Sequence, residues 1–188
     1  MSENTQQART VTSADHGKLD VRALVLLAVL LAAGFILNFT VGKAISGATG
    51  GLISPEFIIS AFCLTILVVR PNIAQALVIG LISAAVIQIT TTSPFIDFAA
   101  EGVAVMLMAA IVNGMMSGKA AKVVPLVGTF VTTVVSGLIF MVIKIAMIGA
   151  AQQLAAAMLP VVVLTGVFNA ILVQALYLPI RKALKLND

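Results

Sequence analysis

Apolar residues dominate six stretches of the chain, and short segments rich in polar residues, glycine or proline separate them. A helix needs about 20 residues to cross a bilayer, and most of the stretches approach or exceed that length. Sustained apolar runs favour membrane helices over the amphipathic helices of a water-soluble domain. The sequence therefore predicts an all-α membrane protein, a bundle of six transmembrane helices. The predicted helices cover residues 23–41, 55–69, 73–89, 101–116, 123–148 and 154–180.

Lysine and arginine residues predict the orientation of this bundle. Nine of the eleven fall in four places, and each place is separated from the next by a pair of apolar stretches. If each pair is a hairpin, all four places lie on one side of the membrane, which the positive-inside rule makes the cytoplasm. Both termini are then cytoplasmic. The nine residues are Arg9, Lys18, Arg22, Arg70, Lys119, Lys122, Arg181, Lys182 and Lys185.

The polar segments predict the domain organisation. Residues 1–20 lack an apolar core of the signal-peptide kind, and we expect a disordered cytoplasmic tail. Residues 21–188 are expected to form a single transmembrane domain. Glycine and serine residues predict a loop over 42–54, and Pro55 is expected to open the second helix.

Composition narrows the class of protein. Hydrophobic residues make up 61% of the chain and charged residues 10%, too few charges to cover a soluble domain. The net charge of +4 resides at predicted helix ends, so we read it as a topology signal and expect lipid contact, not nucleic-acid binding. The single histidine lies in the tail, and no catalytic, zinc-protease or phosphate-loop motif occurs. We expect no enzyme activity, no cofactor and no metal site.

Two acidic residues lie unusually close to basic ones. Thirteen residues separate Glu56 from Arg70, and seventeen separate Glu101 from Lys119. At 1.5 Å per residue these are roughly 21 and 27 Å, whereas the hydrocarbon core is about 30 Å thick. Glu56 is therefore expected at membrane depth, where a carboxylate is tolerated only beside a cavity or a partner. The alternative is that Glu56 lines a thinned outer edge in water.

Lys144 is the other charge that interrupts a predicted helix near its outer end. Its ammonium would reach the outer headgroups by snorkelling, which requires no function. The alternative is that it faces the same outer cavity as the acidic residues. If the ligand is an amino acid, Glu56 would hold its ammonium, and Lys144 or a helix N-terminus would hold its carboxylate.

On this topology the outer half of the bundle collects most of the remaining polar groups. The inner half has only Asn113, Asn169 and Gln174, so the arrangement predicts a binding cup closed on the inside, not a through-pore. The helix starts at Pro55 and Glu101 are expected to add free N–H groups. The predicted substrate-binding residues are Glu56, Asn38, Gln88, Thr91, Thr92, Asp97, Glu101 and Lys144.

The first predicted helix has small residues four apart, Ala28 and Ala32, a spacing that lets another membrane helix approach closely. With its six helices in 188 residues and its outer polar cup, the chain resembles the substrate-binding S components of energy-coupling factor (ECF) transporters. That resemblance implies a prokaryotic cell-membrane protein that captures a solute from the outside. It also implies that the Ala28 and Ala32 face docks on a transmembrane scaffold subunit driven by two cytoplasmic ATPases.

The middle of the chain looks most like the tryptophan-type S components. They share Pro55-Glu56 at the start of the second helix and a threonine run before Pro94, and the resemblance covers about 23–116. Where that type continues with Gly-Gly-Gln, this chain has residues 95–97, Phe-Ile-Asp. The implied ligand is tryptophan, or a related amino acid or vitamin such as cobalamin. A stand-alone small-solute transporter or channel is the alternative function.

Overall fold

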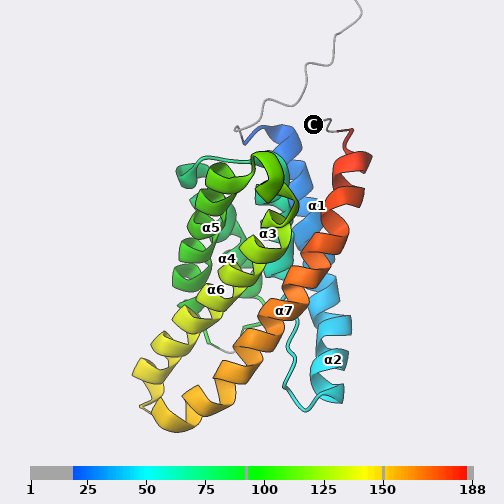
Figure 1. The fold of residues 1–188 in the computed structure, drawn as a ribbon. Helices are drawn as coiled ribbons and strands as arrows, with labels where there is room; N and C mark the ends of the chain where they lie inside the picture. Colours follow the sequence, from blue (N-terminus) through cyan, green and yellow to red (C-terminus); the bar gives the residue numbers. More distant parts are fainter. Residues whose placement is uncertain (1–18, 92, 150, 186–188) are drawn as a thin grey trace, which may run out of the picture.

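The computed structural model describes residues 19–91, 93–149 and 151–185, which form a bundle of helices (Figure 1). All regular secondary structure in these residues is helical. The elements are α1 (Val21–Leu37), the π-helical turn η1 (Asn38–Gly42), α2 (Lys43–Ala48), α3 (Phe57–Val69), α4 (Ile73–Ile87), α5 (Ile96–Met115), the 3₁₀ helix η2 (Gly118–Lys122), α6 (Val124–Ile148) and α7 (Ala151–Ala183).

Four helices in the described residues are long and apolar enough to cross a membrane. They are the continuous helix Val21–Ala48, α5, α6 and the segment Gln153–Ala183 of α7. Many of their large apolar side chains, such as Val29, Val142 and Ile171, face outward and are exposed. An apolar outer surface on long helices is the surface of a membrane protein, because lipid replaces water around it.

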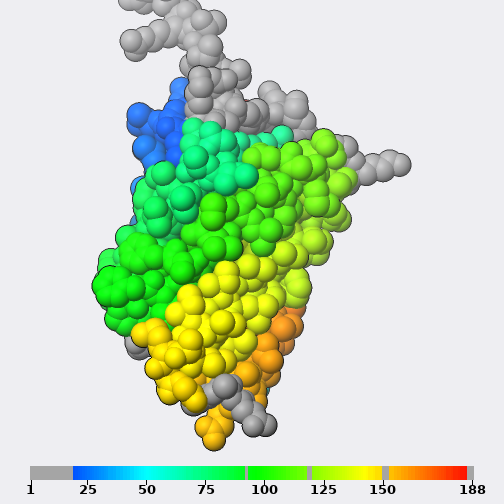
Figure 2. Space-filling view, turned by 90° about the vertical axis from the view of Figure 1, so that its left-hand side faces the viewer, coloured from blue at the N-terminus to red at the C-terminus, as the bar shows by residue number. Residues whose placement is uncertain are grey.

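Helix α3 occupies the centre of the bundle. Twelve of its 13 residues are buried, and it contacts α1, α4, α5, α6 and α7. A helix that is apolar on all sides is buried either in a protein core or in lipid, and here the other helices bury α3. Figure 2 shows α5 and α6 side by side on one face, with the α6–α7 hairpin extending beyond α5 at the lower end.

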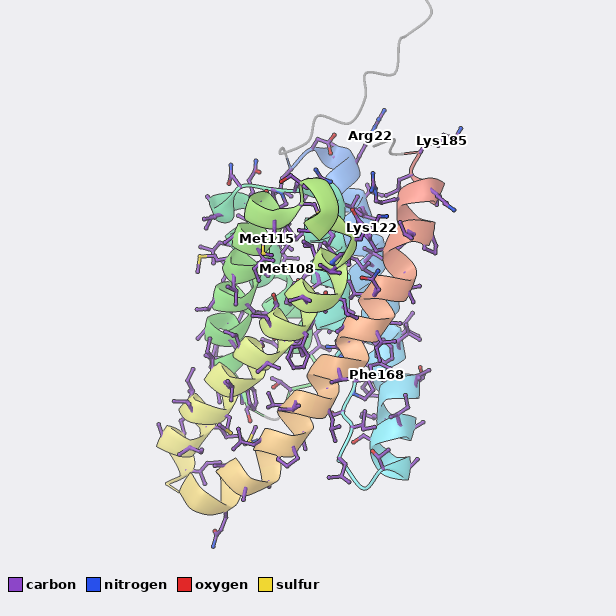
Figure 3. All side chains as sticks on the ribbon, viewed as in Figure 1. Arg22, Met108, Met115, Lys122, Phe168 and Lys185 are labelled. Atoms are coloured by element: carbon purple, nitrogen blue, oxygen red, sulfur yellow. The ribbon has the colours of Figure 1, made fainter. Side chains whose placement is uncertain are left out.

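The two ends of the bundle differ in charge. Arg22 at the start of α1, Lys122 before α6 and Lys185 after α7 all lie toward the upper end in Figure 3. We call this the basic end and the opposite end the cavity end. The chain enters the bundle through α1 and leaves it through α7 at the basic end (Figure 1).

The first helix continues where the sequence predicted a loop. The loop expected over 42–54 is confined to residues 49–54, because η1 and α2 extend the helix to Ala48. Glycines within an apolar membrane segment keep their helical hydrogen bonds, since no water competes for the backbone. The reversal occurs later, at Gly50 and Gly51, whose φ angles of 61° and 84° suit glycine.

The starts of α3 and α5 also differ from the predicted ones. Helix α3 begins at Phe57, with Glu56 as its N-cap, not at Pro55. Helix α5 begins at Ile96, five residues before the expected Glu101. Phe95 adopts a left-handed φ of 69°, which breaks the chain direction immediately before Ile96.

The remaining helices lie where the sequence predicted them, within a few residues. Helix α4 ends two residues early, α6 matches to one residue, and α7 is longer at both ends. Asp20 accepts a 2.8 Å hydrogen bond from the Ala23 N–H and so caps α1. Residues 1–18 of the predicted tail lie outside the described part of the chain.

Candidate functional site

A cavity of about 390 Å³ lies between the start of α3, the α4–α5 connection and helices α5, α6 and α7. Acidic, hydroxyl and apolar side chains line it, together with one lysine. The lining residues are Ser54, Glu56, Ile59, Ile87, Thr90, Thr91, Asp97, Glu101, Thr133, Ser136, Gly137, Phe140, Lys144, Met158, Val161, Val162 and Thr165.

Two asparagines hold the start of α3 at one wall of this cavity. The Phe57 N–H donates to Asn38 Oδ1 at 2.7 Å, and the Glu56 N–H donates to Asn169 Oδ1 at 3.3 Å. Asn169 Nδ2 in turn donates to the Glu56 carbonyl oxygen at 3.2 Å. Side chains from η1 and α7 thus satisfy the N–H groups that a helix start leaves free. They fix the position of Glu56.

Asn38 also contacts the Glu56 carboxylate directly. Its Nδ2 donates to Glu56 Oε2 at 3.4 Å. Asn38 is the first residue of η1, the π-helical turn between α1 and α2. π-turns inside longer helices are frequent at functional sites because they redirect side chains. Here the turn coincides with the residue that supports a cavity carboxylate.

Asp97 lies at the first turn of α5 and is held from α4. Gln88 Nε2 donates to Asp97 Oδ2 at 3.1 Å, while Gln88 Oε1 accepts from the Phe95 N–H at 2.9 Å. One amide side chain therefore joins the end of α4 to the start of α5. The Phe95 N–H bond stabilises the left-handed residue that lets α5 begin at Ile96.

Glu101 lies one helical turn after Asp97 and is 3% exposed. Its Oε1 accepts a 3.0 Å hydrogen bond from Ser136 Oγ on α6. Its Oε2 is buried without a hydrogen-bond partner among the described residues. An unsatisfied buried carboxylate oxygen costs free energy, so native structures rarely retain one without a reason.

One face of α6 follows the cavity along its length. Ser136, Phe140 and Lys144 are four residues apart, which places them above one another on a helix. The Lys144 ammonium lies 5.5 Å from the centre of the Phe140 ring, and both residues line the cavity. The structure therefore places Lys144 at the cavity wall, where its side chain is half-buried.

The structure brings most of the residues predicted from sequence to this cavity. Five of them line it, namely Glu56, Thr91, Asp97, Glu101 and Lys144. Asn38 and Gln88 lie behind the lining and hold Glu56 and Asp97. Thr92 lies outside the described residues.

The N–H groups expected at the helix starts are not free for a ligand. Asn38 and Asn169 accept the N–H groups at the start of α3, and Glu101 lies in the second turn of α5, not at its start. Asn169 had also been assigned to the inner half, but it lies beside Glu56 because α7 crosses the bundle obliquely (Figure 1). Both expectations were wrong.

Sequence reasoning missed the hydroxyl groups contributed by α6 and α7. Thr133, Ser136 and Thr165 line the cavity, and Thr165 Oγ1 donates to the Ser54 carbonyl oxygen at 2.9 Å. A signal for the first two was present. Polar residues recur at 129, 132, 133 and 136 on one side of an otherwise apolar helix, which indicates a face that avoids lipid.

The small-residue face of α1 lies away from the cavity. Ala28 and Ala32 are both exposed, whereas Leu27 and Leu31 pack against the core. Nothing in the described bundle covers these two alanines. They are accessible to another helix.

Among the described residues, no group of three or more His, Cys, Asp or Glu side chains is placed to hold a metal ion. Comparisons of the chain with protein-family models, with curated proteins and with solved structures find no match. What the cavity does must therefore be inferred from its own chemistry.

Proposed function

We propose that this protein is the membrane-embedded substrate-capture subunit of an ECF-type uptake transporter, and that it binds a small polar solute from the outside. The observation that carries the proposal is the 390 Å³ cavity with three carboxylates, one ammonium and several hydroxyls on its walls. Ligand sites usually enclose about 300–1,000 Å³ and combine apolar walls with a few placed polar groups. In a membrane protein, such groups mark a solute site because they are expensive elsewhere.

Packing between the cavity and the basic end favours capture over a channel. Along α3 and α5 the residues that follow the cavity lining toward that end are apolar and fully buried, among them Phe62, Ile66, Met108 and Val112. The hydroxyl of Thr65, in the same region, donates to a backbone carbonyl of its own helix. A solute would find no polar path through these residues.

The proposed topology has six membrane segments with both termini in the cytoplasm. Helices α3 and α4 have 13 and 15 residues, so at 1.5 Å per residue they extend only about 20–22 Å. The cavity occupies the space beyond their ends. Two short helices can therefore pack in a bundle whose other helices are longer. The basic end then faces the cytoplasm, in agreement with the positive-inside rule.

The proposed ligand is tryptophan or a related amino acid. A cavity of about 390 Å³ suits a molecule of that size better than cobalamin, whose corrin ring and nucleotide loop are far larger. The proposed partners are a transmembrane scaffold subunit, which contacts Ala28 and Ala32, and two cytoplasmic ATPases.

Co-purification and ligand identification test the proposal together. The affinity-tagged full chain is expressed with a candidate ECF scaffold and its ATPases, and the bound small molecule is identified by mass spectrometry after denaturation. We expect the complex to form and to lose its scaffold when Ala28→Trp and Ala32→Trp are combined, because bulky residues prevent close helix approach. Ile171→Trp, at an exposed position of α7, is the matched control. A stable complex with both alanines replaced would exclude this docking face, and no complex at all would exclude the ECF assignment.

A further inference from the structure

Glu101 differs from the other two carboxylates of the cavity in what its oxygens contact. Asn38 donates to Glu56 Oε2, and Gln88 donates to Asp97 Oδ2. The Glu101 Oε1 accepts from Ser136, but its Oε2 has no partner among the described residues. Each of the three acids thus accepts from one side chain, but Glu101 is the one with an oxygen that is buried without a partner among the described residues.

The unpartnered Glu101 Oε2 is important for ligand binding because it is buried. Glu101 is 3% exposed and still lines the cavity, so a molecule in the cavity is what can reach it. A charged group out of water needs a partner of opposite charge or several hydrogen bonds. A ligand that donates to Oε2 would supply what the fold does not.

The charges on the cavity walls indicate which kind of hydrogen-bond donor would bind to Glu101. Glu56, Asp97 and Glu101 face the cavity, and Lys144 is the basic residue among its described lining groups. An anionic group near Glu101 would be repelled, whereas a cationic group is attracted. The acids are not grouped so as to hold a metal ion within the described residues. An organic cation with N–H donors, approaching from the cavity side, fits these walls.

We propose that the ligand carries an ammonium group and that Glu101 Oε2 is its principal partner, with Ser136 holding the other carboxylate oxygen in place. This inference rests on the proposed function only in taking the cavity as the solute site. It assigns the recognition of positive charge to Glu101 ahead of Glu56, because Glu101 has a buried oxygen without a partner among the described residues and Glu56 has none. An ammonium donates three hydrogen bonds, and the neighbouring acids and hydroxyls of the wall offer further acceptors.

The first test measures the charge preference of the cavity without knowing the ligand. Met158 lines the cavity from α7, so Met158→Cys in a Cys63→Ala background places a single thiol there. Its reaction rates with a cationic reagent, 2-aminoethyl methanethiosulfonate, and an anionic one, 2-sulfonatoethyl methanethiosulfonate, are compared. Gly47→Cys, at an exposed position of α2, gives the ratio for a thiol outside the cavity.

We expect the cavity thiol to prefer the cationic reagent about tenfold more than the Gly47→Cys thiol does, since lined clefts concentrate ions of opposite sign. Glu101→Gln should remove most of that preference, and Glu56→Gln should remove less of it. A cavity ratio equal to the Gly47→Cys ratio would overturn the inference. A preference that Glu101→Gln leaves unchanged would overturn it equally.

The second test uses three indole probes in calorimetry on the purified full chain. Tryptamine has the ammonium alone, 3-indolepropionate has the carboxylate alone, and tryptophan has both. Tryptamine and tryptophan should bind, and Glu101→Gln should weaken both by about 30-fold or more, as expected when a buried charge loses its partner. Binding of 3-indolepropionate as tight as that of tryptamine would overturn the inference while leaving solute capture intact. If no indole binds, the tryptophan assignment fails, and the reagent ratio alone decides the role of Glu101.

Discussion

The same helices line the cavity at the cavity end of this bundle and form the packed core toward its basic end. On α5, Glu101 lines the cavity. Met108, which lies two turns closer to the basic end and is labelled in Figure 3, is fully buried. On α6, Ser136 donates to Glu101, whereas Thr132 donates to the Met108 sulfur at 3.5 Å. Thr132 thus contacts a neighbouring core side chain, whereas Glu101 at the cavity end keeps one oxygen without a hydrogen-bond partner among the described residues.

Within a single helix, the residues that set the free energy of unfolding therefore differ from those that set ligand affinity. Near the basic end a small residue such as Gly128 allows close packing, since a Cβ there would lie 3.3 Å from the Met108 sulfur. At the cavity end the same helices leave polar side chains on the walls of the cavity. We therefore expect substitutions near the basic end to change the free energy of unfolding, and those at the cavity end to change ligand affinity.

The largest expected difference between the two ends is the side of the membrane that each one faces. In intact cells, a thiol reagent that does not cross membranes should label Gly47→Cys and Gly149→Cys, both exposed at the cavity end, in a Cys63→Ala background. Lys122→Cys, exposed at the basic end, should react only after the membrane is permeabilised. Labelling of Lys122→Cys in intact cells would reverse the proposed orientation.

Truncation of the buried core should give the next largest effect. Met108→Ala removes a fully buried side chain that contacts α6, and we expect it to lower the free energy of unfolding by about 2–5 kcal/mol. Denaturant titration of the purified protein in detergent measures this change. Ligand affinity of the folded fraction should remain within about twofold, since the cavity is two turns away along α5. A severe loss of affinity with unchanged stability would mean that the two ends are not separate.

Neutralising Glu56, the carboxylate that Asn38 holds, should change ligand affinity and not stability. The expected change in free energy is smaller than that for Met108→Ala. Glu56→Gln retains an oxygen that can accept from Asn38 but removes one negative charge from the wall. We expect ligand affinity to fall about tenfold, or about 1.4 kcal/mol, with the unfolding midpoint unchanged. Calorimetry with tryptophan measures the affinity, and Glu101→Gln in the same assay provides the stronger comparison. An effect of Glu56→Gln larger than that of Glu101→Gln would make Glu56 the principal acidic contact.

Lys144 should contribute least. Its side chain is half-buried at the cavity wall, and partly solvated charges contribute about 0.2–1 kcal/mol, so Lys144→Ala should weaken tryptophan binding about two- to fivefold. Tryptamine, which lacks a carboxylate, should bind Lys144→Ala as well as it binds the original protein. An unchanged affinity for tryptophan would return Lys144 to a snorkelling role.

Local patterns in the sequence predicted a large part of this arrangement. The apolar run of α6 and the start of α4 lie where they were expected, because hydropathy is a property of adjacent residues. The short distance from Glu56 to Arg70 predicted a cavity or a partner beside Glu56, and Glu56 lines the cavity and accepts from Asn38. Asp97 and Glu101, four residues apart, lie on one face of any helix that contains both. These features needed no knowledge of the neighbouring helices.

Contacts between distant segments could not be predicted in the same way. Asn169 holds the start of α3 across a separation of 113 residues, and Ser136 reaches Glu101 across 35. Both depend on how far α6 and α7 rotate and tilt, which is set by packing at positions such as Gly137 beneath Val162, where a Cβ would lie 2.8 Å from a Val162 methyl group. Asn38, the first residue of η1, likewise finds its partners on Glu56 and Phe57, 18 and 19 residues further along the chain.

The sequence by itself determined that the chain is helical and apolar, where most of its helices lie and which charges sit near their ends. These properties follow from the free energy of placing each residue in lipid or in water, a sum over neighbours in the chain. Only the tertiary structure decided which polar groups meet and which remain unpaired. Hydrogen bonds depend on distances of a few tenths of an ångström between separate helices. That is why Glu101, one of the three acids that line the cavity, is the one with an oxygen that the fold buries without a hydrogen-bond partner among the described residues.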